Sequence, residues 1–178
     1  MKIIAFGASN SKKSINKKLA TFAAQQFLNS EIEILDLNEY EMPIYSIDDE
    51  LSNAVPEKAI LFADKIDSSD LVIISFAEHN GSYTVAFKNI FDWVSRVPNR
   101  TAFGDKKMFL LATSEGKMGA KTVLNSAVAR FPYNGGNVIA HFSLPEFSKN
   151  FDENKGIINE EQKALFQKEL NKIKESLQ

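Results

Sequence analysis

The residues Gly7-Ala8-Ser9-Asn10-Ser11-Lys12-Lys13-Ser14 follow an apolar run and precede a stretch with helical periodicity. Hydroxyl groups and the backbone N–H groups at the start of a helix are groups with which proteins enclose a phosphate. Two lysines in the same stretch add positive charge. The segment therefore predicts an anion-binding loop between a first strand and a first helix.

A Walker A loop, G-x-x-x-x-G-K-[ST], is the first of three loop types that could account for this segment. Gly7 and Lys13-Ser14 fit it, but Lys12 stands where the second glycine lets the backbone wrap the phosphates. The acid that would hold magnesium is also poorly matched, because Asp70 precedes its strand and the acid after that strand is Glu78. A phosphate-loop kinase is therefore a weak alternative.

The other two loop types bind nucleotides without the Walker lysine. A dinucleotide fingerprint, G-x-G-x-x-G, is excluded because Ser9 and Lys12 occupy positions that need glycine. In a serine-rich nest of the flavodoxin kind, the hydroxyls of Ser9, Ser11 and Ser14 would surround a terminal phosphate together with backbone N–H groups. Ser14 and Asn16 also suit ordinary helix capping, so these residues alone leave capping and phosphate binding open.

Five β-rich runs alternate with five helical patterns along the chain. The expected strands are Ile3–Phe6, Glu31–Asp36, Leu71–Phe76, Met108–Ala112 and Val138–Phe142. The expected helices cover about 15–23, 56–66, 83–96, 119–130 and 160–177, with Asn159 as the N-cap of the last. The segment Ser143–Ile158 is expected to be a long loop.

This alternation predicts an α/β fold, a parallel sheet with helices on both faces. Ligands of such sheets bind outside the carboxyl ends of the strands. The loops to consider are Gly7–Ser14, Ala77–Tyr83 and Thr113–Gly119, which are rich in Gly, Ser, Thr and Asn. Two glycine-bearing loops beside one phosphate nest outline a slot for a nucleotide with a flat ring.

The composition limits the function classes. A chain of 178 residues suits one domain, 1–178. The formal net charge of −2 shows no electrostatic footprint for nucleic acid or an anionic membrane. The absence of cysteine excludes disulfides, thiolate zinc sites and a cysteine nucleophile, and no stretch is apolar enough to span a membrane. We expect a soluble, cytoplasmic domain.

The three loops together resemble the NAD(P)H-dependent FMN reductase family. The first is similar to the family's G-S-x-R-x-x-S-x-N signature, and the third to its S-x-G-x-x-G turn. The second, with the helix after it, resembles P-E-Y-N-x-S-x-P-x-x-L-K-N-x-x-D-W. The matching residues of that segment are Glu78, Asn80, Gly81, Ser82, Lys88, Asn89, Asp92 and Trp93. The resemblance implies a flavodoxin-like three-layer sandwich with a five-stranded parallel sheet in the order 2-1-3-4-5.

The resemblance also implies where the cofactor lies. Ser9, Ser11, Ser14, Asn16 and the N–H of Ile15 would form the FMN phosphate site. The loop Ala77-Glu78-His79-Asn80-Gly81-Ser82 would follow the pyrimidine side of the flavin, largely through backbone groups, with Ser114 and Gly116 at the other edge. Glu78 is interpreted as a residue that shapes its loop.

Three departures from the family pattern concern the site. Ser11 replaces the signature arginine, so Lys12 or Lys13 would have to supply the phosphate cation. Ala77 and His79 replace the usual proline and tyrosine, and His79 could titrate near neutral pH beside the flavin. The proline usually found after the serine is absent, with Val85 at or near its position.

The residues of the helix after the second loop have simpler interpretations. Lys88 and Asp92 are interpreted as a surface ion pair. Phe87, Phe91 and Trp93 are interpreted as core, although an exposed aromatic patch there would support a dimer.

The predicted function is an FMN-dependent oxidoreductase that passes electrons from NADPH or NADH to a small acceptor by ping-pong hydride transfer, without a protein catalytic group. The acceptor (flavin, quinone or azo compound), the nucleotide preference and the choice between homodimer and homotetramer stay open. The main alternative is a flavodoxin-type electron carrier that does not oxidise NAD(P)H. Carriers of that type tend to be strongly acidic, whereas this chain is nearly neutral.

Overall fold

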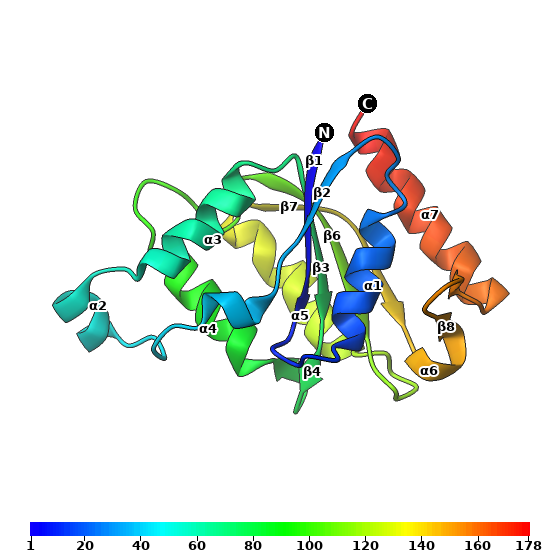
Figure 1. Cartoon of the computed structure of the whole chain (residues 1–178), viewed down its shortest axis with the longest axis horizontal. Helices are drawn as coiled ribbons and strands as arrows, with labels where there is room; N and C mark the ends of the chain where they lie inside the picture. The colour runs from blue at the N-terminus through cyan, green and yellow to red at the C-terminus, as the bar shows by residue number, and fades with distance from the viewer.

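A sheet of five parallel strands forms the centre of the molecule, in the order β2-β1-β3-β6-β7 (Figure 1). The computed structural model describes all residues, 1–178. The strands are β1 (Lys2–Ala8), β2 (Glu31–Ile34), β3 (Leu71–Phe76), β6 (Lys106–Thr113) and β7 (Gly136–Leu144). Since β6 and β7 are the fourth and fifth strands of this sheet, the order is the predicted 2-1-3-4-5, and the flavodoxin-like fold is confirmed.

Helices cover both faces of the sheet and complete a three-layer sandwich (Figure 1). On one face lie α1 (Ile15–Ala24) and α7 (Glu160–Ser176), and on the other α3 (Glu57–Asp67), α4 (Val85–Val94) and α5 (Lys121–Arg130). Alternate residues of a strand enter opposite layers. In β1, Ile3 and Ala5 pack in the α1 layer, whereas Ile4 and Phe6 pack in the α4 layer.

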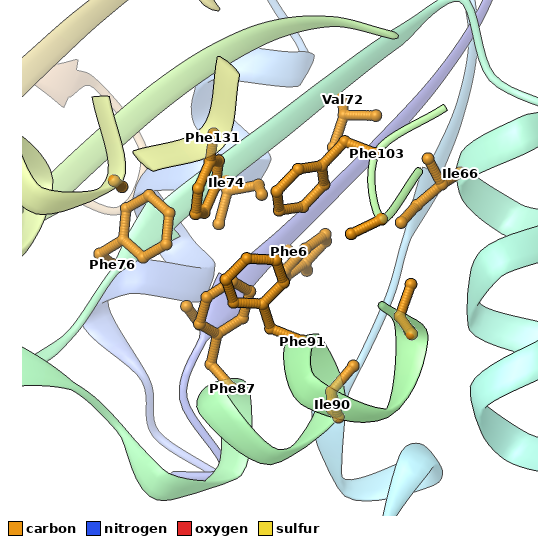
Figure 2. Packing of buried hydrophobic residues seen from close by; sticks show 14 of the residues in the cluster. Phe6, Ile66, Val72, Ile74, Phe76, Phe87, Ile90, Phe91, Phe103 and Phe131 are labelled. Atoms are coloured by element: carbon orange, nitrogen blue, oxygen red, sulfur yellow. The ribbon is translucent and has the colours of Figure 1, made fainter. Parts of the chain in front are cut away.

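The α4 layer is rich in aromatic side chains (Figure 2). The fully buried Phe131 has its ring centroid 4.2 Å from that of Phe103 and 5.5 Å from that of Phe91. Phe87, Phe91 and Trp93 are at most 8% exposed, which confirms their interpretation as core. These three side chains therefore form no exposed aromatic patch.

The segment before the last helix is not the long loop that the sequence suggested. Strand β7 continues to Leu144, and the chain then forms α6 (Phe147–Asn150) and a hairpin of β8 (Phe151–Asp152) and β9 (Gly156–Ile157). Apolar side chains of this segment, including Phe147 and Ile157, join the α1 layer of the core. Burial of these side chains explains why the segment is ordered.

Four further small elements were not predicted. They are η1 (Leu37–Tyr40), α2 (Ile47–Asn53), the hairpin of β4 (Glu78–His79) and β5 (Ser82–Tyr83), and η2 (Phe131–Asn134). Helix α2 has no buried residue and stands away from the body of the molecule (Figure 1). None of the helices combines the length and apolar character needed to cross a membrane.

Candidate functional site

The loops that follow β1, β3 and β6 meet at the carboxyl ends of these strands and enclose a cleft of about 250 Å³. Most residues predicted for the site line this cleft: Ser9, Ser11, Ser14, Ile15, Asn16, Ala77, Glu78, His79 and Ser114. Lys13, Thr113 and Glu115 also line it. The predicted residues Asn80, Gly81, Ser82 and Gly116 do not line it.

The first loop is held against α1 by a close backbone approach. A Cβ atom on Gly7 would lie 2.4 Å from the backbone nitrogen of Lys17, so only glycine lets the helix start here. The hydroxyl of Ser14 accepts a hydrogen bond from that nitrogen at 3.1 Å and keeps its own proton for a ligand. The backbone N–H groups of Ile15 and Asn16 have no partner in the protein. Capping and anion binding are therefore compatible in one residue.

The side chain of Asn16 connects the first loop to strands β3 and β6 and does not point at a ligand. Its Oδ1 accepts hydrogen bonds from the N–H of Thr113 at 3.1 Å and the hydroxyl of Ser75 at 2.7 Å. Its Nδ2 donates to the carbonyl of Thr113 at 3.1 Å, and the residue is 2% exposed. Asn16 can therefore contribute its backbone N–H to a phosphate while its side chain fixes the loops.

The second loop is a tight hairpin whose tip turns away from the cleft. Glu78 and His79 pair with Tyr83 and Ser82, and the turn residues Asn80 and Gly81 have φ angles of 52° and 75°. These left-handed conformations are those of an Asn-Gly hairpin turn, and neither residue lines the cleft.

Two side-chain contacts anchor the hairpin. The carboxylate of Glu78 accepts a hydrogen bond from the N–H of Val123 in α5 at 2.9 Å, which agrees with a loop-shaping role. The hydroxyl of Thr84 donates to the carbonyl of Ala8 at 2.9 Å and so connects this loop to the first. Thr84, Ser75 and Thr113 were not singled out from the sequence, because nothing in their local context indicates such distant partners.

The third loop is supported by the segment that contains α6. The N–H of Phe147 donates to the carbonyl of Ser114 at 3.1 Å, and that of Glu146 to the carbonyl of Gly116 at 3.2 Å. The carboxylate of Glu115 accepts from the hydroxyl of Ser148 at 2.8 Å. With its carbonyl turned to this support, Gly116 lies outside the cleft.

A second cavity of about 370 Å³, lined mainly by apolar residues, adjoins the cleft. Its apolar lining includes Leu37, Tyr40, Met42, Ile44, Val85 and Ile90. His79 lines both cavities, and Asn10 of the first loop lines this one. The site therefore has a polar half made of loop ends and an apolar half between η1 and α4.

Comparison with known protein families decides what this arrangement is. The sequence pattern of the NADPH-dependent FMN reductase family matches residues 1–149 of this chain. The chain belongs to this family. It is accordingly an oxidoreductase whose cofactor is FMN and whose electron donor is NAD(P)H.

Several individual proteins and solved structures are similar to this chain. An uncharacterized protein of Mycoplasma pneumoniae is 33% identical over 152 residues, covering 81% of this chain and 87% of that one. An NAD(P)H:quinone oxidoreductase of Solanum tuberosum is 29% identical over 68% of this chain but only 63% of its own length. The flavoenzyme FerB of Paracoccus denitrificans has the same fold, with a TM-score of 0.76, 22% identity and coverage of 96% of this chain and 93% of its own.

The residues of the cleft fit the FMN that the family requires. Its phosphate end offers hydroxyls, N–H groups and one lysine, Lys13, which suit a phosphate dianion. The carboxylate of Glu78 is engaged with Val123, and that of Glu115 with Ser148. Both carboxylates keep their charge, but these hydrogen bonds direct them to Val123 and Ser148.

Proposed function

We propose that this FMN reductase passes electrons from NAD(P)H to a quinone-class acceptor, with both substrates using the same site in turn. The observation that carries the proposal is the junction at His79 between the polar cleft and an apolar cavity large enough for a small flat ring. In balance, NAD(P)H, a proton and the quinone yield NAD(P)⁺ and the hydroquinone. The quinone reductases among the relatives support this acceptor class.

Bound FMN would supply the centre that takes up a hydride from the nucleotide and returns the electrons to the acceptor. The chain's own contribution is position and electrostatics. Ser9, Ser14 and the free N–H groups of Ile15 and Asn16 would hold the phosphate end. Backbone groups of Ala77–His79, together with Ser114, would stabilise negative charge along the edge of the flavin ring.

The apolar cavity would hold the acceptor. Its lining by aliphatic side chains and Tyr40 favours an uncharged flat ring. His79, at the junction of the two cavities, is placed to hydrogen-bond a carbonyl oxygen of that ring. A small quinone is one such ring, and the quinone reductases among the relatives favour it over a flavin or an azo compound.

Steady-state kinetics with NADPH and 1,4-benzoquinone test this proposal. If the two substrates use one site in turn, plots of reciprocal rate against reciprocal quinone concentration should give parallel lines at different NADPH concentrations. Val85→Trp, which would fill the apolar cavity, should raise the KM for the quinone about tenfold. Because the nucleotide uses the same site in turn, it should also raise the NADPH concentration needed for half-maximal flavin reduction. Leu28→Trp, at a side chain 84% exposed and outside both cavities, is the matched control. Intersecting lines, or equal effects of the two variants, would contradict the proposal.

We also propose that the protein is a homodimer or homotetramer, as its resemblance to the family implies. Exposed aliphatic side chains support this: Ile47 and Leu51, both on α2, are 53% and 79% exposed. Burying them against a second copy would stabilise an α2 that has no packed side of its own. Light scattering of the wild type and of Leu51→Asp measures this directly: the wild type should be oligomeric and the variant smaller.

A further inference from the structure

A second polar groove, which we call the α1 groove, begins at the phosphate end of the cleft. It has a volume of about 370 Å³ and is lined by Lys12, Lys13, Lys17, Lys18, Phe22 and Phe151 together with smaller residues and Glu153. Lys13 and Ser14 line both this groove and the cleft. The α1 groove therefore opens directly beside the phosphate end of the cleft.

The charges of the α1 groove are not all compensated. Lys17 forms an ion pair with Asp36 at 2.6 Å, and this hydrogen bond lowers the pKa of the Asp36 carboxyl. Lys18 pairs with Glu153. Lys12 and Lys13 have no carboxylate partner, so the positive charge that remains lies at the end where groove and cleft join.

The two lysines without partners differ in position. Lys13 lines the cleft as well, where it would serve the FMN phosphate in place of the signature arginine. Lys12 lines the α1 groove and not the cleft. Lys12 can therefore bind an anionic group other than the FMN phosphate. The compact charge of a lysine ammonium suits a phosphate.

An apolar surface lies beside these cations. Phe22 and Phe151 meet edge to face, with ring centroids 5.5 Å apart and an interplanar angle of 90°. Phe22 is backed by Phe166 at 5.4 Å and by Gly156, whose backbone passes so close that a Cβ there would clash with the ring. Phe151 is only 9% exposed, so the half-buried ring of Phe22 is the one that could contact a base in the groove that Lys12 also lines.

We propose that the α1 groove binds the adenosine end of NADPH and that Lys12 contacts its 2′-phosphate, which makes the enzyme selective for NADPH over NADH. This inference rests on the proposed function, in which NAD(P)H enters the cleft beside FMN. NADH lacks the 2′-phosphate, so the uncompensated charge would act on NADPH alone, and selectivity is the difference between the two affinities.

Calorimetry on the FMN-loaded protein tests the site without turnover. The probes are 2′,5′-ADP and 5′-ADP, which carry the same number of phosphates at different positions. We expect 2′,5′-ADP to bind at least about fivefold more tightly, and Lys12→Ala to remove most of this difference. Lys58→Ala, an exposed lysine without an ion pair on the opposite face of the sheet, should preserve it. Equal affinity of the wild type for both probes, or an unchanged ratio in Lys12→Ala, would overturn the inference.

Replacing the acid of the groove should strengthen the binding of 2′,5′-ADP, whereas Lys12→Ala should weaken it. Glu153→Gln removes the acid of the groove and releases Lys18 from its ion pair. We expect it to tighten 2′,5′-ADP binding about two- to threefold, and to do so less at high salt because exposed charges are screened. Weaker binding in Glu153→Gln would contradict the assignment of the groove to an anion.

The outcomes separate this inference from the function on which it rests. If NADH and NADPH reduce the bound flavin with the same concentration dependence, the enzyme is a reductase and the α1 groove does not read the 2′-phosphate. If neither nucleotide reduces bound flavin, the proposed function fails whatever the binding of 2′,5′-ADP.

Discussion

Asn16 and Thr113 lie 97 positions apart in the sequence and are joined by two hydrogen bonds, each 3.1 Å long. The amide of Asn16 meets both the N–H and the carbonyl of Thr113, as a neighbouring strand would, and it also accepts from Ser75. The first and third loops are therefore tied to each other through this side chain. The phosphate end and the far edge of the cleft are held at a fixed separation before any ligand binds, which lowers the ordering cost of binding.

Replacing Asn16 by alanine should weaken FMN binding although its side chain does not face the cofactor. The change leaves buried polar groups of Thr113 and Ser75 without partners, which should cost about 2–4 kcal/mol of stability. We expect FMN affinity to fall at least about tenfold, because the loops lose their fixed separation. Urea denaturation and titration of FMN fluorescence measure the two effects.

Two further variants complete this experiment. Asn171→Ala, on the exposed side of α7, is the control and should change neither quantity. Asn16→Asp should be at least as damaging as Asn16→Ala, since a buried carboxylate cannot donate to the carbonyl of Thr113. Full FMN affinity in Asn16→Ala would show that the connection does not organise the site.

Arginine at position 11 should increase the retention of FMN. The exposed side chain of Ser11 lines the cleft, and its N–H already donates to the hydroxyl of Ser9 at 3.1 Å. A guanidinium there would add a fork of donors to a phosphate site that has Lys13 as its cation. Titration of FMN fluorescence should show about five- to tenfold tighter binding in Ser11→Arg than in the wild type. The uncharged Ser11→Gln is the control, and equal affinity of the two variants would refute the expectation.

Tyr83→Phe should stabilise the protein. The Tyr83 hydroxyl is buried without a hydrogen-bond partner while its ring stacks on Phe131, and burial raises its pKa to about 12. Removing an unsatisfied hydroxyl should raise the free energy of unfolding by up to about 1 kcal/mol at pH 7.

The pH dependence of this effect has a definite sign. Burial favours the neutral phenol, so the raised pKa contributes stability that is full below pH 10, the ordinary value, and is lost as the pH approaches about 12. Tyr83→Phe should lack this loss, so its advantage in thermal melts should widen above pH 10. Tyr133→Phe, at a side chain 81% exposed, should show neither effect. A wild type that melts higher than Tyr83→Phe at pH 7 would indicate an unrecognised partner for the hydroxyl.

The sequence was sufficient for the sheet and for the loops at its carboxyl ends. Continuous apolar runs such as Leu71–Ile74 mark strands buried on both faces, and the predicted sheet edge is where the cleft lies. It was not sufficient for the connections between the loops. Asn16 resembles a capping residue locally, and its partners Ser75 and Thr113 are distant in the chain. Spacing within one loop does not report on such contacts.

The small elements were missed for a different reason, because their signals are short. Ser46 caps α2 by accepting from the N–H of Asp49 at 3.0 Å, a pattern visible in the sequence but followed by no apolar stripe. The turn of the β8–β9 hairpin lies between Asp152 and Gly156. The carboxylate of Asp152 accepts hydrogen bonds from two backbone N–H groups in this turn, each at 2.9 Å. Two-residue strands have no periodicity to detect.

The most direct test of the account is anaerobic stopped-flow mixing of the FMN-reconstituted protein with NADPH and, separately, with NADH. We predict that the absorbance of the bound flavin near about 450 nm bleaches on mixing and returns when 1,4-benzoquinone is added. A protein that binds FMN but keeps its absorbance with both nucleotides would be an electron carrier, and the reductase account would be wrong.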